Sequence, residues 1–341
     1  MVFNRIGDLT MSTPLFRALA DRGELSLLTR PFGVPLLAGQ SFVHKVYSLT
    51  YLNRGRPGLG NVFLGGYRRA LAKDLRRDGF DDVWIYDTER PVIKRWLAGA
   101  FPGKVHEIPR REAPGKHAST IYREAAAHTG CDMDRYDPHP TLEIPPDRRA
   151  EAERLLGELG QRVVGVQMGS QRTTSWRLRR RPDRKALTSH QWATLIIRLI
   201  AEEHADAVAI HGAPSEKRMV RRFIRGLPAS VRPRCHDLST RASLDLLPAL
   251  LAGHQALISV DTGPAHIAAA VGCPVLVCFG PTDPSVFAPR GKGMVETLVG
   301  RAPCQFCHAT TLYKDCRDNR CLNRVPDSQL WESWSRLRDK L

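Results

Sequence analysis

The sequence predicts an α/β protein made of two units, each with a mostly parallel sheet. Three observations support this prediction. Short apolar runs alternate with longer amphipathic stretches along the whole chain. A proline-rich segment, "DPHPTLEIPPD" (137–147), interrupts the alternation and is the best candidate for a linker. The chain of 341 residues is also long enough for two domains, each with a core of its own.

In the first half, the apolar run "MVF" (1–3) leads through a loop to a helix that begins near Thr13. Thr13 suits the N-cap, Pro14 suits the first helical position, and Gly23 suits the stop. Later apolar runs predict strands at 25–29, 45–49, 82–86 and 104–108, with helices near 64–78 and 119–129.

The second half opens with a helical pattern over 148–160. Buried strands are then predicted at 162–167, 205–211, 255–260 and 274–279, with helices near 189–204, 216–227, 243–252 and 262–271. The last segment is amphipathic and predicts a closing helix that packs through Leu330, Trp334 and Leu337. We therefore expect domains over 1–146 and 147–325 and a closing helix over 326–341.

The formal net charge of +16 suggests an anionic partner: nucleic acid, an anionic membrane or glycolipid surface, or a phosphorylated substrate. A charge that serves only solubility remains an alternative. Aromatic residues are few and do not alternate with basic ones, so we expect no nucleic acid. No apolar run approaches the ~20 residues of a membrane-spanning helix, and Asp8 lies where a secretory signal would be basic or apolar. The expected location is the cytoplasm, with peripheral contact at the inner face of the membrane as a possibility.

The stretch "SVDTGPAH" (259–266) places an acid, a turn and a histidine directly after a predicted strand. In a parallel sheet this is the edge at which ligands bind. The amides of Thr262 and Gly263 begin the next helix and would attract phosphate, with His266 one turn further along. Asp261 could then accept hydrogen bonds from sugar hydroxyls. The alternative is an Asp N-cap before a buried helix, with a core histidine.

The stretch "NRIGDLTMSTP" (4–14) places Asp8 in a predicted loop of the first domain. A carboxylate there could take a proton from an acceptor hydroxyl. Taken alone, the motif favours the alternative, an Asx-turn or a cap for the helix that begins near Thr13. "CFGPTDPSVFAP" (278–289) follows a later strand and would lie beside the 261–263 turn.

These motifs together resemble glycosyltransferase family nine, the ADP-heptose lipopolysaccharide heptosyltransferases. The resemblance is carried by "RIGDLTMSTPLFRAL", "HGAPSEKR" (211–218), "LSTRASLDLLPALLAGHQALI" (238–258) and "SVDTGPAHIAAAVGCPVLVCFGPTDP", in the order of the family. It spans nearly the whole chain.

The resemblance implies a GT-B architecture, in which two Rossmann-like domains face each other across a cleft. The acceptor would bind the N-terminal half and the nucleotide-sugar donor the C-terminal half. The implied reaction moves a sugar, most simply heptose from ADP-heptose, to a hydroxyl of a lipopolysaccharide-core or related glycan. It inverts the anomeric centre without a catalytic metal or cofactor. Asp8 matches the general base, Glu216 matches the acid that holds the nucleoside, and Asp261, Thr262, Gly263 and His266 match the donor loop.

Two departures from the family pattern stand out. Gly169 and Ser170 match a donor-binding pair, but a basic insertion separates them from Lys185, the aligned phosphate lysine. Leu187 stands where the family has tryptophan, and Arg172, Arg177 or Arg179 could supply the charge instead. The insertion would either contact an anionic acceptor or be a solvated loop. The first strand is also shorter than in the family.

Cys304, Cys307, Cys316 and Cys321 lie within eighteen positions as CxxC-x8-C-x4-C. Four such thiolates suit a structural zinc or iron site, which is a better explanation than disulfides in a reducing compartment. The family often carries a similar cluster, and some protein-directed relatives bind iron through it. The alternative is four reduced thiols that pack a short loop.

Other functions remain open at this point. The same fold could use another nucleoside-diphosphate sugar or a protein acceptor. A non-catalytic, basic nucleic-acid-binding protein would explain the charge and the cysteines but not "DTGPAH" or "RIGD". A dehydrogenase is weaker still, because no G-x-G-x-x-G follows a first strand.

Overall fold

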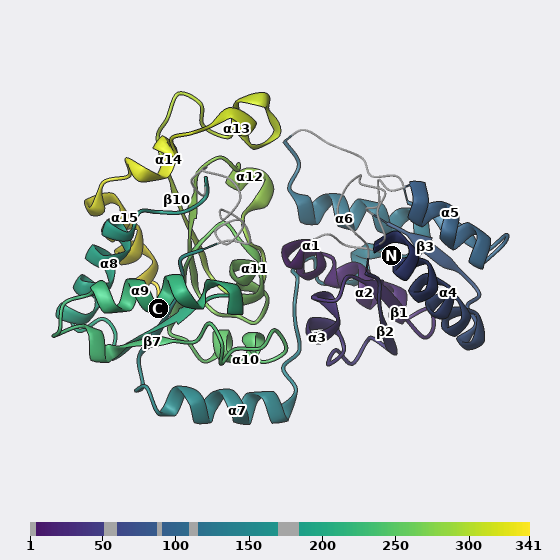
Figure 1. Ribbon diagram of the computed structural model, residues 1–341, viewed down its shortest axis with the longest axis horizontal. Helices are drawn as coiled ribbons and strands as arrows, with labels where there is room; N and C mark the ends of the chain where they lie inside the picture. Colours follow the sequence, from purple (N-terminus) through teal and green to yellow (C-terminus); the bar gives the residue numbers. More distant parts are fainter. Residues whose placement is uncertain (1–4, 51–59, 87–90, 109–114, 170–183) are drawn as a thin grey trace. The chain divides into compact units, whose positions relative to one another are not determined.

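The computed structural model describes residues 5–50, 60–86, 91–108, 115–169 and 184–341. The chain divides into two compact units (Figure 1). The N-terminal unit comprises Met1–Pro114 and Thr120–Pro138, and the C-terminal unit comprises Gly115–Ser119 and His139–Leu341. The run expected at 1–3 lies outside the described residues.

The N-terminal unit contains two separate parallel pairs of strands. β1 (Ser26–Thr29) pairs with β2 (Lys45–Ser48), and β3 (Val83–Ile85) pairs with β4 (Val105–Glu107). All four match apolar runs in the sequence. The helices are α1 (Ile6–Met11), α2 (Thr13–Ala20), α3 (Gly33–Leu37), α4 (Gly60–Asp78), α5 (Pro91–Ala100) and α6 (Ala118–Ala126).

The segment that carries Asp8 is helical, so the prediction of a loop there was wrong. Side-chain hydroxyl groups donate hydrogen bonds to backbone carbonyls in the short helix α1 and at its junction with α2. Thr10 Oγ1 donates to the Ile6 carbonyl at 3.0 Å, and Ser12 Oγ donates to the Asp8 carbonyl at 2.8 Å. The expected N-cap, Thr13, is instead the first residue of α2, and its hydroxyl donates to the Thr10 carbonyl. Such back-bonding gives the hydroxyl groups hydrogen-bond partners inside the helix, and it is typical of short or bent helical segments.

The C-terminal unit is built on a six-stranded parallel sheet in the order β10-β9-β8-β5-β6-β7. Its central strands are entirely buried, as continuous apolar runs predict for a sheet covered on both faces. The edge strands β7 and β10 were not predicted. The strands are β5 (Val163–Gln167), β6 (Ala207–His211), β7 (Cys235–Asp237), β8 (Ala256–Val260), β9 (Val275–Phe279) and β10 (Val295–Val299).

Helices cover both faces of this sheet (Figure 1). One face packs against α8 (Ser189–Ala201), α9 (Lys217–Gly226) and α15 (Asp327–Arg338) through a single large apolar cluster. That cluster includes Leu330, Trp334 and Leu337, so the predicted packing of the C-terminal helix is confirmed. The other face packs against α7 (Pro146–Gly157), α10 (Leu247–Ala252) and α11 (Gly263–Ala270). The described helices include none that is both long and apolar enough to cross a bilayer.

The strand order identifies where a ligand should bind. β5, the first strand of the unit, lies between β6 and β8. The chain therefore proceeds outward from β5 in one direction and from β8 in the other, which is the doubly wound topology. Ligands of such sheets bind outside the carboxyl ends of the strands at this switch point.

Candidate functional site

The switch point brings together two segments that the sequence predicted as donor-binding. Gln167 at the end of β5 is in register with Ser259 near the end of β8, so Gly169 and Asp261 follow neighbouring strands. Gly169 is buried, and its carbonyl accepts a hydrogen bond from Gln167 Nε2 at 2.9 Å. The other predicted members of this loop, Ser170 and the arginines at 172, 177 and 179, lie outside the described residues.

Asp261 is the centre of a buried polar network at this edge. Its Oδ2 accepts hydrogen bonds from Lys185 Nζ and, at 2.6 Å, from Thr282 Oγ1. Burial alone would raise the pKa of the Asp261 carboxyl, but the Lys185 charge and both hydrogen bonds outweigh it and hold the pKa below its ordinary value. The carboxylate is therefore ionised and fixed. It holds Lys185 at the switch point.

Helix α11 begins directly beside this network. Thr262 precedes it in an extended conformation, Gly263 is its first residue, and Pro264 occupies the first turn. This is the arrangement by which a helix presents its positive end to an anion. His266, one turn along, is 6% exposed, and its charge helps to lower the pKa of Asp261.

Glu216 lies near the end of the neighbouring strand β6, in the short 3-10 helix Pro214–Glu216. It is 4% exposed, and its Oε2 accepts a hydrogen bond from the Ala213 amide at 2.8 Å. A Cβ at Gly212 would lie only 3.2 Å from that oxygen, so a side chain there would crowd the Glu216 carboxylate.

The cysteine-bearing segment, residues 304–321, braces the loops that carry Lys185 and Thr282. Gln305 Nε2 donates to the Gly280 carbonyl at 2.6 Å, and the His308 amide donates to the Pro281 carbonyl at 2.9 Å. On the other side, Asn319 Nδ2 donates to the Ala186 carbonyl at 2.7 Å. Arg184 donates to the carbonyls of Lys314 and Cys316 and lies over the ring of Tyr313.

The four thiols of this segment are close enough to influence one another. Burial raises the pKa of the Cys321 thiol to about 12, and the charges of Cys304, Cys307 and Cys316 add to the rise. Cys316 Sγ donates to the Asp318 carbonyl and Cys321 Sγ to Asn319 Oδ1, each at 3.2 Å. The donor set suits zinc or iron. Among the described residues, no three or more His, Cys, Asp or Glu side chains are grouped closely enough to hold an ion in the arrangement seen here.

In the N-terminal unit, Asp8 has a partner that the sequence did not reveal. Tyr122 of α6 donates its phenol hydrogen to Asp8 Oδ1 at 3.0 Å. The Tyr122 side chain is 8% exposed, and its ring meets that of Tyr86 edge to face, with 5.4 Å between the centroids. The tyrosine is therefore held in place, and it fixes one oxygen of a half-buried carboxylate.

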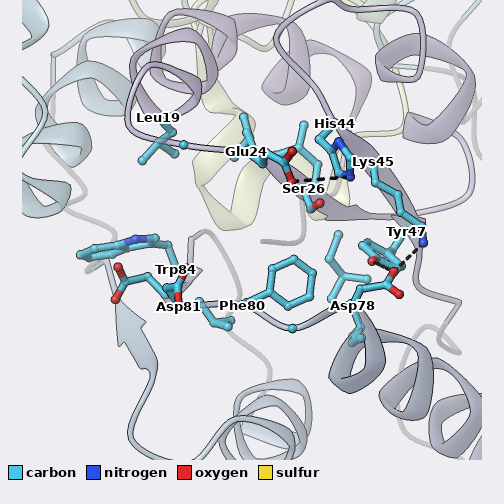
Figure 2. A pocket seen from close by; sticks show the side chains of 18 of the residues that line it. Leu19, Glu24, Ser26, His44, Lys45, Tyr47, Asp78, Phe80, Asp81 and Trp84 are labelled. Atoms are coloured by element: carbon cyan, nitrogen blue, oxygen red, sulfur yellow. Dashed lines mark hydrogen bonds and ion pairs between the residues drawn. The ribbon is translucent and has the colours of Figure 1, made fainter.

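A cavity of about 750 Å³ in the same unit contains none of the predicted site residues (Figure 2). It lies at the amino ends of the strands, since Ser26, Lys45 and Val83 begin β1, β2 and β3. Ligands of parallel sheets bind at the opposite edge. We therefore do not assign this cavity to the donor or the acceptor.

Comparisons with known proteins agree with the motifs. Residues 105–316, more than half of the chain, match glycosyltransferase family 9 (heptosyltransferase). Lipooligosaccharide heptosyltransferase 2 of Haemophilus influenzae is 28% identical over 155 residues, which are 44% of this chain and 42% of that relative. The chain thus spans less than half of that protein's length in the match. Lipopolysaccharide heptosyltransferase 2 of Escherichia coli K12 is 26% identical over 319 residues, with 86% of each chain covered.

A solved structure shows the same fold. That of E. coli ADP-heptose lipopolysaccharide heptosyltransferase II superimposes with a TM-score of 0.74 at 17% identity, covering 100% of this chain and 98% of that one. The α/β GT-B fold predicted from the sequence is confirmed. With a family match over most of its length, a doubly wound C-terminal sheet and the motifs in order, this chain belongs to glycosyltransferase family 9, the heptosyltransferases.

Proposed function

We propose that this protein transfers a sugar, heptose from ADP-heptose, to a hydroxyl of a lipopolysaccharide-core or related glycan acceptor, with inversion at the anomeric carbon. The observation that carries the proposal is the network of Lys185, Asp261 and Thr282 beside the start of α11. A cation and a helix N-terminus at a switch point suit a diphosphate. A fixed carboxylate beside them suits sugar hydroxyls.

On the donor side, the proposed chemistry is stabilisation of the leaving nucleoside diphosphate. Lys185 and the α11 amides are fixed before the reaction, so they can stabilise the developing negative charge without reorganising. Gly169 and Gly263 allow the backbone to approach the donor closely. Glu216 and His266 complete the proposed donor set, Glu216 towards the nucleoside and His266 towards a phosphate oxygen.

On the acceptor side, Asp8 is the proposed general base. Its carboxylate would take the proton of the attacking hydroxyl while the bond to the donor diphosphate breaks. Tyr122 supports this role because it occupies Asp8 Oδ1 and leaves the second oxygen for the acceptor. The whole-chain charge of +16 suits an anionic acceptor, and we propose peripheral contact with an anionic membrane surface that presents it.

Mass spectrometry of the products tests the function directly. Purified protein is incubated with ADP-heptose and candidate lipid A–core acceptors, and a mass increase of one heptose on the acceptor is the expected result. UDP- and GDP-sugars run in parallel, and a product from one of them alone would replace the proposed donor. Asp8→Asn should lower the rate of product formation to a small residual level with ADP affinity kept, whereas Asp74→Asn, at an exposed ion pair, should change neither.

The four cysteines support a second, structural proposal. We propose that Cys304, Cys307, Cys316 and Cys321 bind one zinc or iron ion when the metal is supplied, and that the ion stiffens the segment behind the donor loops. Elemental analysis of protein prepared with either metal should find about one ion per chain. The double variant Cys307→Ser/Cys321→Ser should lose it, and Cys131→Ser should retain it. Metal-free protein with unchanged thermal stability and ADP affinity would show that the four are reduced thiols.

A further inference from the structure

One side of helix α9 carries a continuous row of arginines. The row consists of exposed side chains at the spacing i, i+3, i+4 and i+7, which are Arg218, Arg221, Arg222 and Arg225. Residues at this spacing lie on the same face of a helix. The other side of α9 is apolar: Val220 is fully buried in the core of the C-terminal unit, and Phe223 and Ile224 pack against that core. The arginine row therefore faces solvent.

The arginine row has little negative charge nearby to balance it. Residues 217–234 include seven basic residues and no acidic one. Arg221 forms an ion pair with Asp237 of β7, with 3.2 Å between Nε and Oδ2. The other three arginines of the row form no ion pair with any described residue. Because like charges three or four residues apart destabilise a helix, the row lowers the stability of α9, and an anionic partner would offset this loss.

A neighbouring arginine shows how a structural role looks in this region. Arg234 is half-buried, and its guanidinium donates to the carbonyls of Ala205 and Asp206 just before β6. In the row, by contrast, Arg218 and Arg222 make no hydrogen bond within the described part of the chain. Their charges therefore do not stabilise the fold, and both groups are available to a partner.

The chemistry of the row fits the head groups of anionic phospholipids. Guanidinium groups bind phosphate through paired hydrogen bonds, and clusters of about four or more basic residues on an amphipathic helix are typical of contact with anionic lipid. The large apolar side chains that are exposed in the described ranges all lie elsewhere: Tyr67, Met294, Phe306, Leu312 and Leu341. The row therefore lacks both the apolar anchors of a protein interface and the stacking side chains of a single-strand nucleic-acid site.

We propose that the arginine row of α9 is the surface through which this protein contacts anionic phospholipid. This inference rests on the membrane contact of the proposed function and assigns that contact to one helix. The guanidinium groups bind head-group phosphates, while Val220 and its apolar neighbours keep α9 packed on the core. The contact is therefore electrostatic, and α9 stays at the level of the head groups.

Two double variants of the full chain test the row. Arg218→Gln/Arg222→Gln removes two of its charges, and glutamine has nearly the helix propensity of arginine. The control Arg149→Gln/Arg154→Gln removes the same charge from exposed positions of α7, which packs on the other face of the sheet. On acceptor-free vesicles of phosphatidylglycerol and phosphatidylcholine, the first variant should bind about 10- to 30-fold more weakly than the unaltered protein. The control should bind nearly as tightly as the unaltered protein.

Hydrogen exchange locates the contact without any substitution. The same vesicles should slow amide exchange in α9 and leave α7 unchanged, and vesicles of phosphatidylcholine alone should affect neither helix. The melting temperature of Arg218→Gln/Arg222→Gln should not fall, because the change removes repulsion between like charges. A weaker affinity of this variant for vesicles would then not result from a loss of folded protein.

Three outcomes would overturn the proposal. Equal losses of vesicle binding in the two double variants would show an effect of total charge alone. Tighter binding of short duplex DNA than of the vesicles, at the same salt concentration, would assign the row to nucleic acid. Slower product formation by Arg218→Gln/Arg222→Gln on a soluble acceptor stripped of its lipid would place the row in the active site. If the unaltered protein forms no product at all, the proposed transferase function fails, whereas vesicle binding still decides the role of the row.

Discussion

The phenol of Tyr122 fixes the orientation of the Asp8 carboxylate. One oxygen of the carboxylate is occupied by Tyr122, and the ring of Tyr122 is in turn held by Tyr86. General bases depend on orientation as much as on basicity, because the accepting oxygen must lie within hydrogen-bond reach of the proton. Tyr122 is therefore a positioning residue for the proposed base.

Tyr122→Phe should lower kcat about tenfold while the Kd for ADP and the melting temperature stay unchanged, because the ring still fills its place. In the Asp8→Asn background the same change should cost nothing further, because residues that act as one unit are not additive. Tyr136→Phe, which removes a phenol bound to Asp21 on the same unit, is the matched control and should leave kcat unaltered. Equal losses in both backgrounds would contradict a role through Asp8.

Lys185→Met should weaken ADP binding by about 10- to 100-fold, the range expected for the loss of a charged hydrogen-bonding partner. The variant also leaves the buried Asp261 with one hydrogen bond fewer, so the melting temperature should fall. Thr282→Val keeps the lysine and should weaken ADP binding less. Isothermal titration calorimetry measures both affinities, with the exposed Lys292→Met as control. An unchanged affinity in Lys185→Met would indicate that Arg172, Arg177 or Arg179 binds the donor diphosphate instead.

Residues of the site differ in how far the sequence could predict them. The "DTGPAH" motif gave Asp261, Thr262, Gly263 and His266, and the structure places all of them at the switch point. Tyr122 could not be found, because its partner Asp8 lies 114 positions away and no motif joins them. The pairing of Lys185 with Asp261 was hidden for the same reason, since 76 positions separate them.

Between β6 and the segment after α10, two buried histidines face each other. The Nε2 atoms of His211 and His254 are 2.6 Å apart, and neither Nδ1 has a hydrogen-bond partner among the described residues. Gly165 of β5 makes room for them, because a Cβ there would lie 2.6 Å from His254 Cδ2. Burial lowers the pKa of His211 to about 4 and that of His254 well below its ordinary value.

Folding stability should therefore fall as the pH drops from about 6.5 towards 4. In this window the two histidines become protonated in the unfolded chain and stay neutral in the folded one, so protonation favours unfolding. Chemical denaturation at pH 7.0, 5.5 and 4.5 measures the loss. The double variant His211→Leu/His254→Leu should show a shallower dependence, and His128→Gln, at an exposed position, should keep the original one. An equally steep loss in the double variant would assign the effect to other groups, His117 first among them.

In the C-terminal unit, strands with continuous apolar runs were predicted well, and the edge strands β7 and β10 were not. β5, β6, β8 and β9 are buried throughout, so their sequences carry an unbroken signal. β10 is an edge strand. Its apolar run is interrupted by Glu296, which forms an ion pair with Arg336 of α15. The helix α1 was missed because it is short and contains Gly7, Asp8 and Thr10, which have weak intrinsic helix preference.

On the scale of the whole molecule, the formal charge of +16 is the feature that no single element explains. Lysine and arginine near an anionic surface contribute about 1 kcal/mol each, and salt screens this attraction within about a Debye length. A chain of this charge should therefore approach anionic lipid in a salt-dependent manner.

Cosedimentation with vesicles tests this expectation. Vesicles that contain anionic phospholipid should bind the protein at low salt and release most of it when the ionic strength rises several-fold. Vesicles of zwitterionic lipid alone should bind little at either salt. Binding that depends on neither the lipid charge nor the salt concentration would contradict an electrostatic contact.

The chain passes between its two units at residues 114–115, 119–120 and 138–139. The short stretch between the first two crossings belongs to the C-terminal unit, where His117 Nε2 binds the Ala288 carbonyl and Arg290 donates to Ser119. Cleavage after Pro138 would therefore leave five residues of the C-terminal unit, Gly115–Ser119, on the N-terminal fragment. A separately produced C-terminal unit would lack those residues, together with the hydrogen bonds that His117 and Ser119 make to the Ala288 carbonyl and Arg290.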